Sequence, residues 1–255
     1  MKIKNIITNT EPCALHLNGG YDNNKYGHSI CTQFKENYGD IKKEKLREDV
    51  ALGFYMLGNK QKTMIEESAE FFGVEVNNIY CDGLGVPPKK PANAFTRRRL
   101  LKSKPFAMEK FLLKNKSLKY VIGWDSTDVF LAKHPNKIVE IFEKEFDCKF
   151  LFNAEKNLYP KNAKSIYDKL FLKDEFNITK SKFCYLNSGL FIADVEYYLN
   201  MMERYREIDK QNIKGEDQAR FQRLFSENFG DIQIDFDCKI FQSTHSLSDE
   251  LEIEN

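Results

Sequence analysis

Residues 119–135 read KYVIGWDSTDVFLAKHP, an apolar run that ends at two acids, Asp125 and Asp128. A short apolar run of this kind predicts a buried strand, and the carboxyl ends of strands in a doubly wound sheet face the ligand crevice. Two carboxylates separated by a tight bend can bind Mg²⁺ or Mn²⁺ together with the oxygens of a diphosphate. The same acids can instead cap the turn and the segment after it, and the spacing alone favours caps.

The rest of the chain has the pattern of one α/β domain. Strand-like and helix-like runs alternate over residues 49–243, which predicts a mostly parallel central sheet. A Gly-, Pro- and Arg-rich loop is expected at 82–99, followed by a short helix over 103–115. Residues 1–45 fit the alternation least well, but no linker separates them, so we expect a single domain over residues 1–255.

Composition excludes several classes of function. The 255 residues are 42% apolar, enough for a sizeable core, and carry a formal net charge of +1. That balance argues against a nucleic-acid partner. No run approaches the roughly 20 apolar residues of a membrane span, and the N-terminus lacks a secretory signal. The six cysteines are scattered without a C-x-x-C pair, which predicts reduced thiols and a cytoplasmic location.

Polar residues that could belong to a site stand at two further places in the sequence. Asn187, Ser188 and Gly189 break the apolar run YLNSGLFIA, and glycine there allows a ligand or a second backbone to come close. Asp217 and Gln218 stand at a predicted helix start in GEDQ, where acids usually act as caps. Taken alone, each feature is more often a bulge or a cap than part of a site.

One rival chemistry is disfavoured by a single position. Enzymes that form an aspartyl-phosphate also place an aspartate after a buried strand, but they need a second acid two residues later. Thr127 occupies that position after Asp125. The general acid of that chemistry is therefore missing.

In order along the chain, five motifs resemble those of one family. They are YVIGWDSTDVFLA (120–132), FLFNAEKNLYP (150–160), YLNSGLFIA (185–193), EDQARFQRLF (216–225) and IDFDCKIFQS (234–243). Together they resemble the glycosyltransferase domain of the procollagen lysyl hydroxylases and related collagen-type galactosyl- and glucosyltransferases. AEFFGVEV (69–76) and SKPFAMEKFLL (103–113) extend the resemblance, which covers about residues 49–243.

The resemblance implies a GT-A fold that binds a UDP-sugar through Mn²⁺ or Mg²⁺ and transfers a hexose to a hydroxyl acceptor on a protein or glycan. Asp125 and Asp128 would bind the metal, and Lys104 and Thr127 would contact the nucleotide, although relatives have an aromatic residue in place of Thr127. Carried over by position, the remaining site residues are Asn187, Ser188 and Gly189 in the sugar pocket, Asp217 and Gln218 facing the sugar or acceptor, and Tyr159 near the acceptor mouth. We name Asp217, Gln218 and Asn187 as the catalytic candidates, with Glu155 as a second choice for acceptor activation.

The family's third metal ligand is the histidine of an H-x-N-G motif that follows the IFQ segment. In this chain the motif appears instead at residues 16–19, which read HLNG. The N-terminal segment therefore resembles a circularly permuted copy of the family's last strand, with His16 as the metal ligand and Asn18 and Gly19 at the cofactor. Termini of compact domains often lie close together, which makes such a rearrangement tolerable. LNGG is also a hairpin-turn signal, and His245 is the rival ligand.

Two functions remain open from the sequence. The first is a metal-dependent transferase of glucose or galactose from a UDP-sugar. The second is a catalytically inactive protein of the same fold that binds a nucleotide sugar or glycan. The second is motivated by Thr127 in place of an aromatic residue, by Tyr159 where relatives often have Trp, and by the displaced histidine motif.

Overall fold

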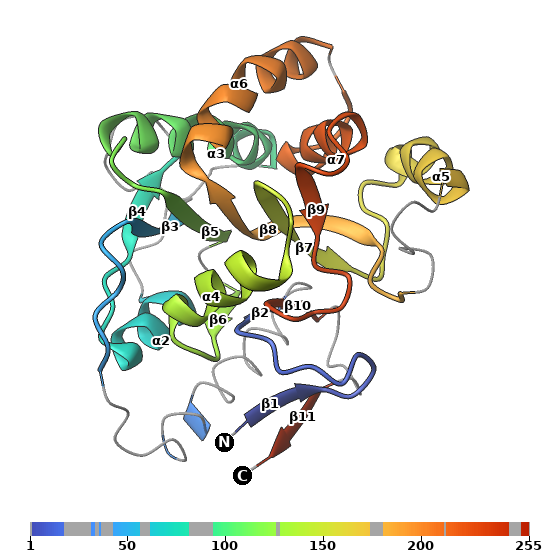
Figure 1. Cartoon of the computed structure of the whole chain (residues 1–255). Helices are drawn as coiled ribbons and strands as arrows, with labels where there is room; N and C mark the ends of the chain where they lie inside the picture. The colour runs from blue at the N-terminus through green and yellow to red at the C-terminus, as the bar shows by residue number, and fades with distance from the viewer. Residues whose placement is uncertain are drawn as a thin grey trace.

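The structure is a computed structural model of the whole chain (Figure 1). It describes residues 2–17, 32–33, 36, 43–56, 62–81, 94–125, 128–173, 181–211, 213–244 and 251–254.

A six-stranded sheet forms the centre of the molecule. Its order is β4 (Asn77–Tyr80), β3 (Val50–Met56), β5 (Tyr120–Asp125), β8 (Tyr185–Asp194), β7 (Phe150–Glu155) and β9 (Ile232–Ile234). The neighbouring pairs are parallel except those that β8 makes, because β8 runs antiparallel to both β5 and β7. The predicted α/β fold with a mostly parallel central sheet is confirmed.

A second sheet of three short strands brings the N-terminus into the fold. Strand β2 (Ala14–His16) lies between β10 (Phe241–Ser243) and β6 (Val129–Leu131), parallel to the first and antiparallel to the second. Strands β1 (Lys2–Asn5) and β11 (Leu251–Glu254) pair as an antiparallel ribbon, so the two ends of the chain lie side by side (Figure 1). The segment that fits the sequence alternation least well thus supplies the central strand of a sheet.

Helices cover both faces of the central sheet (Figure 1). They are α2 (Met64–Phe72), α3 (Ala94–Lys114), α4 (Pro135–Glu145), α5 (Lys164–Lys173), α6 (Val195–Lys210) and α7 (Asp217–Glu227), with a 3₁₀ turn at η1 (Lys161–Ala163). One buried cluster joins α2, α4 and the small sheet to one face, and a second, aromatic cluster joins α3, α6 and α7 to the other. Burial of these two clusters is the main force that holds the layers together.

Local signals fix several helix ends. Thr63 and Glu66 form a capping box at the start of α2, and Gly73 ends that helix in the left-handed region at φ 71°. Asp194 is the N-cap of α6, and its side chain accepts from the backbone N–H of Tyr197 at 2.9 Å. By contrast, the predicted start of the helix at Ser103 is wrong, because α3 begins at Ala94. Its first turns are rich in Ala, Arg and Leu, which are good helix formers despite the Pro-rich stretch before them.

The helices and the cysteines bear on two expectations from the composition. In the described part of the chain, none of the helices combines the length and the apolar character needed to span a bilayer. The five cysteines in that part are free thiols.

Candidate active site

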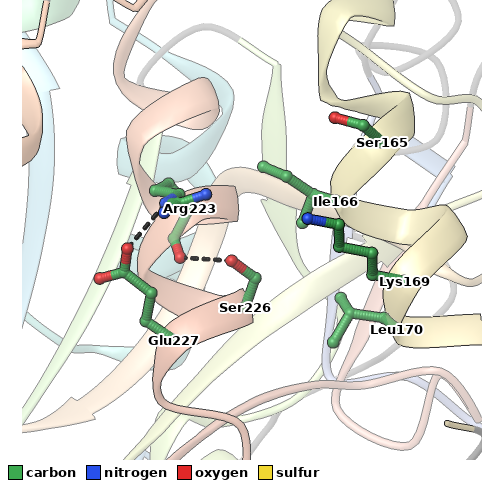
Figure 2. A pocket seen from close by; sticks show the side chains of 7 residues that line it. All are labelled: Ser165, Ile166, Lys169, Leu170, Arg223, Ser226 and Glu227. Atoms are coloured by element: carbon green, nitrogen blue, oxygen red, sulfur yellow. Dashed lines mark hydrogen bonds and ion pairs between the residues drawn. The ribbon is translucent and has the colours of Figure 1, made fainter.

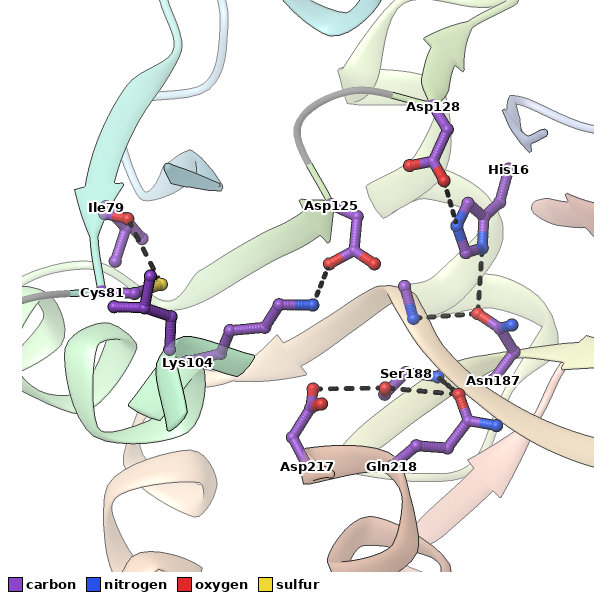
Figure 3. Close-up of polar contacts among 12 residues, drawn as sticks. His16, Ile79, Cys81, Lys104, Asp125, Asp128, Asn187, Ser188, Asp217 and Gln218 are labelled. Carbon is purple, nitrogen blue, oxygen red and sulfur yellow. Dashed lines mark hydrogen bonds and ion pairs between the residues drawn. The ribbon is translucent and has the colours of Figure 1, made fainter. Parts of the chain in front are cut away.

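Three side chains from distant parts of the sequence converge at one end of the sheets (Figure 3). Asp125 ends β5, Asp128 directly precedes β6, and His16 ends β2. One ligand atom from each lies within 4.8 Å of the others. The distance from His16 Nε2 to Asp128 Oδ2 is 3.5 Å. The structure therefore brings together the three predicted metal ligands.

The chemistry of this cluster fits a divalent cation. The imidazole of His16 is buried, whereas the side chains of Asp125 and Asp128 are 27% and 24% exposed, so a cation here can be reached from solvent. Asp128 Oδ1 is buried and has no hydrogen-bond partner among the described residues. A buried oxygen without a partner is costly, and coordination to a cation would satisfy it. One nitrogen and two carboxylates form a donor set that Mn²⁺ and related ions accept.

The electrostatics of the cluster follow from the same contacts. Burial lowers the pKa of His16, but the carboxylates of Asp128 and Asp125 outweigh it, and the net pKa is raised. Burial raises the pKa of Asp128, but the charges of His16 and Lys104 outweigh it, and the net pKa is lowered. Asp128 is therefore held as a carboxylate, the form that binds a metal.

The orientation of His16 is set by strand β8. His16 Nδ1 lies 3.0 Å from Asn187 Oδ1, which also accepts from the backbone N–H of Gly189 at 2.9 Å. An amide oxygen can only accept, so Nδ1 carries a proton, and Nε2, which faces Asp128, is the nitrogen that would bind a metal. Such an outer partner fixes the tautomer of metal-bound histidines. Asn187, which was predicted to be catalytic, contacts the cluster mainly through this hydrogen bond with His16.

Gly189 packs against the His16 ring. A Cβ at position 189 would lie 2.1 Å from His16 Cε1 and 2.6 Å from Nδ1, which is too close for any side chain. Gly189 was predicted to line the sugar pocket. In the structure, its lack of a side chain leaves the space that the imidazole of His16 occupies.

We therefore expect Gly189→Ala to push the His16 ring away from Asn187. The overpacking should cost about 1–3 kcal/mol of unfolding free energy, and Mn²⁺ affinity, measured by isothermal titration calorimetry, should fall at least about tenfold. Gly53→Ala is the matched control, because its Cβ would meet Ile79 Cδ1 at 2.6 Å and not His16. That variant should lose stability and keep its Mn²⁺ affinity. Equal Mn²⁺ affinities for Gly189→Ala and the wild type would contradict the expectation.

Lys104 reaches the site from α3. Its side chain is only 4% exposed, and its ammonium forms an ion pair with Asp125 Oδ1 (Figure 3). The ring of Tyr55 lies beneath it, 5.5 Å from Nζ to the centroid. Burial lowers the pKa of Lys104, but Asp125 and Asp217 outweigh it and raise the pKa well above its ordinary value. Lys104 is therefore a permanent positive charge inside the site.

Asp217 and Gln218 meet β8 from the first turn of α7. Ser188 Oγ lies 3.3 Å from Asp217 Oδ2, and the backbone N–H of Ser188 donates to Gln218 Oε1 at 3.1 Å. Burial raises the pKa of Asp217 to about 6; Lys104 opposes this shift and Asp125 adds to it. A carboxyl with a pKa near neutrality is suited to accept a proton or to steady positive charge.

Buried side chains of α7 anchor the backbone at Tyr159, between β7 and η1. Gln218 Nε2 donates to Tyr159 O at 2.7 Å and to Glu155 Oε1 at 3.0 Å, and Gln222 Nε2 donates to the same carbonyl of Tyr159 at 2.8 Å. The side chain of Tyr159 is 54% exposed. The side chain of Tyr159, predicted to lie near the acceptor, is thus exposed to solvent while its backbone carbonyl is fixed by two hydrogen bonds. Gln218, predicted to be catalytic, also stabilises this backbone.

Arg220 is a supporting residue that the sequence pattern did not single out. It is 1% exposed, pairs with Asp209, and donates to Glu216 O at 2.8 Å and Gly215 O at 3.2 Å. It therefore holds the turn that presents Asp217. No local pattern distinguishes it from Arg223 on the same helix, which is half exposed.

Several predicted residues are not placed. Asn18, Gly19, Thr127 and the rival ligand His245 lie outside the described residues. Their predicted contacts with the cofactor or metal stay predictions.

A separate pocket of about 230 Å³ lies between α5 and α7 (Figure 2). Its lining includes Lys169 from α5 and Arg223 from α7, whose guanidinium is paired with Glu227 at 2.7 Å. None of the residues predicted for the site lines this pocket. It is therefore not part of the cluster around Asp125.

A solved structure has a weak overall similarity to this chain. The crystal structure of mouse xyloside xylosyltransferase 1, apo form, is similar at a TM-score of 0.43 and 14% identity, with 82% of this chain and 81% of that chain covered. A TM-score this low supports no conclusion about activity. No curated protein matches the sequence.

The model of the PLOD GT domain family matches residues 97–255, more than half of the chain. The matched range contains Asp125, Asp128, Asn187 and Asp217, whereas His16 lies outside it and stands on its geometry alone. The family resemblance predicted from the sequence is confirmed. The chain belongs to the PLOD GT domain family of glycosyltransferases.

Proposed function

We propose that this protein transfers a hexose, glucose or galactose, from a UDP-sugar to a hydroxyl acceptor on a protein or glycan, in a reaction that depends on a divalent cation. The observation that carries the proposal is the convergence of His16, Asp125 and Asp128 beside the buried carboxyl of Asp217. Membership of a glycosyltransferase family supplies the reaction class. The donor, the sugar and the metal are the proposed parts.

His16, Asp125 and Asp128 would hold Mn²⁺ or Mg²⁺. When bound, the ion supplies positive charge against the diphosphate as UDP departs. The two partly exposed carboxylates lie on the open side of the cluster and the buried imidazole on the closed side. The protein therefore fixes three ligands and leaves room for phosphate oxygens.

The sugar would lie between β8 and the start of α7. Ser188 and Asp217 present a hydroxyl and a carboxyl that already face each other across 3.3 Å. With a pKa of about 6, Asp217 is mostly ionised at pH 7 and can accept a hydrogen bond from an acceptor hydroxyl or stabilise positive charge on the sugar ring. We assign Asn187 chiefly to positioning His16, because its side-chain oxygen is used there.

The test is release of UDP. The purified protein is incubated with Mn²⁺ and UDP-glucose or UDP-galactose, with and without hydroxylysine-containing peptides and glycans, and free UDP is measured. We expect release with one donor, stimulated by one acceptor class and abolished by a chelator. Binding of UDP without release from any donor would favour the inactive binding protein instead. Absence of both binding and release would contradict the proposed function.

A further inference from the structure

Lys104 and the proposed metal share one carboxylate. The ammonium of Lys104 contacts Asp125 Oδ1, and Asp125 is also a member of the His16, Asp125 and Asp128 cluster (Figure 3). The Lys104 side chain has little freedom to move away, because it is 4% exposed and its Nζ lies 5.5 Å from the centroid of the Tyr55 ring. The ammonium of Lys104 is therefore a fixed positive charge beside the place where a cation would bind.

A count of charges shows the consequence. Asp125 and Asp128 together carry −2, which a divalent cation alone would neutralise. With the ammonium of Lys104 and the carboxylate of Asp217 added, the occupied site carries no net charge, but Lys104 and the cation are still two positive charges on one carboxylate, Asp125. Like charges repel strongly in a partly buried setting, where the effective dielectric constant is well below that of water. An anionic diphosphate beside the cation offsets this repulsion and is attracted by both positive charges.

We propose that Lys104 makes binding of the divalent cation conditional on the diphosphate of the nucleotide: it opposes the cation alone and favours the cation and diphosphate together. This inference rests on the proposed function and adds an order of events to it. The metal enters the site with the nucleotide sugar rather than waiting there. By linkage, the metal increases the affinity for UDP by the same factor as UDP increases the affinity for the metal.

The alternative is that Lys104 only neutralises buried carboxylates. In that case, removing its charge would change cation binding by the same factor with and without the nucleotide. The proposal requires the two factors to differ, since loss of the Lys104 charge strengthens binding of the cation alone and removes the attraction to the diphosphate. The enhancement of Mn²⁺ binding by UDP therefore separates a coupling role from a purely local one.

The experiment measures Mn²⁺ affinity with and without saturating UDP, by titration calorimetry or by electron paramagnetic resonance of free Mn²⁺. For Lys104→Met we expect binding of Mn²⁺ alone to tighten at least about tenfold and the enhancement by UDP to shrink at least about tenfold. Lys114→Met removes the same charge from the exposed end of α3 and should change neither quantity. Lys104→Arg keeps the charge and should not tighten Mn²⁺ binding.

Each outcome decides between the ideas. Either an unchanged enhancement by UDP in Lys104→Met or weaker binding of Mn²⁺ alone by that variant overturns the inference and leaves the proposed function intact. A wild-type protein that binds neither Mn²⁺ nor UDP overturns both. Lys104→Gln serves as a second neutral variant, and circular dichroism checks folding. If neither neutral variant folds, the wild type still decides, because equal Mn²⁺ affinity with and without UDP overturns the inference.

Discussion

Replacing His16 with alanine is expected to weaken Mn²⁺-dependent binding of UDP by on the order of a hundredfold, about as much as Asp128→Ala. The reason is geometric. His16 Nε2 faces Asp128 Oδ2 at 3.5 Å from the closed side of the cluster, with its tautomer set by Asn187. Removal of the imidazole takes away the only nitrogen ligand of the three and leaves two carboxylates that hold the metal less tightly.

The measurement is the affinity for UDP at fixed Mn²⁺ and in the presence of a chelator. Only the Mn²⁺-dependent part should fall in His16→Ala, and circular dichroism should show an unchanged fold. His245→Ala is the matched control, since His245 is the rival ligand at the other end of the sequence. If His245→Ala loses the metal-dependent part and His16→Ala keeps it, His16 is not the third ligand and the idea of a permuted histidine motif loses its support.

The position of Asp125 at the end of a buried strand and the fold class could be predicted because their signals are local, whereas the metal-binding role of the acids was implied only by the family resemblance. The apolar run before Asp125 is a buried strand, and the alternation of strands and helices does produce a mostly parallel sheet. The N-cap Asp194 was likewise visible in the sequence. In each case neighbouring residues determine the structure, so a single sequence is sufficient.

The rest depended on contacts between distant segments. Strand β2 has three residues, and its place between β10 and β6 joins residues more than a hundred positions apart. Periodicity carries no information about such pairing, and only the family's histidine motif pointed to His16. Likewise, Gly189 looked like a place for a ligand, whereas its neighbour is the His16 ring. The burial of Arg220 in an ion pair with Asp209 could not be predicted either, because sequence patterns treat arginine as a surface residue.

Asp217→Asn is expected to lower the turnover number by at least about a hundredfold while leaving the affinity for UDP within about threefold of the wild type. General acid or base groups contribute factors of this size. Asparagine has nearly the same shape and can still accept the hydrogen bond from Ser188 Oγ, so the network around α7 is preserved. The check is initial-rate kinetics of UDP release together with a UDP titration. A variant with wild-type turnover would remove Asp217 from the chemistry and direct attention to Glu155.

The same substitution should stabilise the metal-free protein, because Asp217 is held in the fold at a cost. Burial raises its pKa from 3.8 to about 6, so the folded state binds the proton more tightly than the unfolded state. Its contribution to stability is complete below pH 4 and is lost as the pH rises through 6. The loss amounts to at most about 3 kcal/mol at pH 7 and above. Asparagine does not titrate, so Asp217→Asn should exceed the wild type in unfolding free energy at pH 7.5.

Urea unfolding at pH 4 and pH 7.5 measures this difference. The advantage of Asp217→Asn should be present at pH 7.5 and absent at pH 4. Asp168→Asn is the control, because it makes the same change at an exposed aspartate that is paired with Lys164. If Asp217 lowers the unfolding free energy at pH 7.5 and its replacement abolishes turnover, its role is in the reaction and not in the fold. An Asp217→Asn protein that is less stable than the wild type at pH 7.5 would instead show that the carboxylate supports the fold.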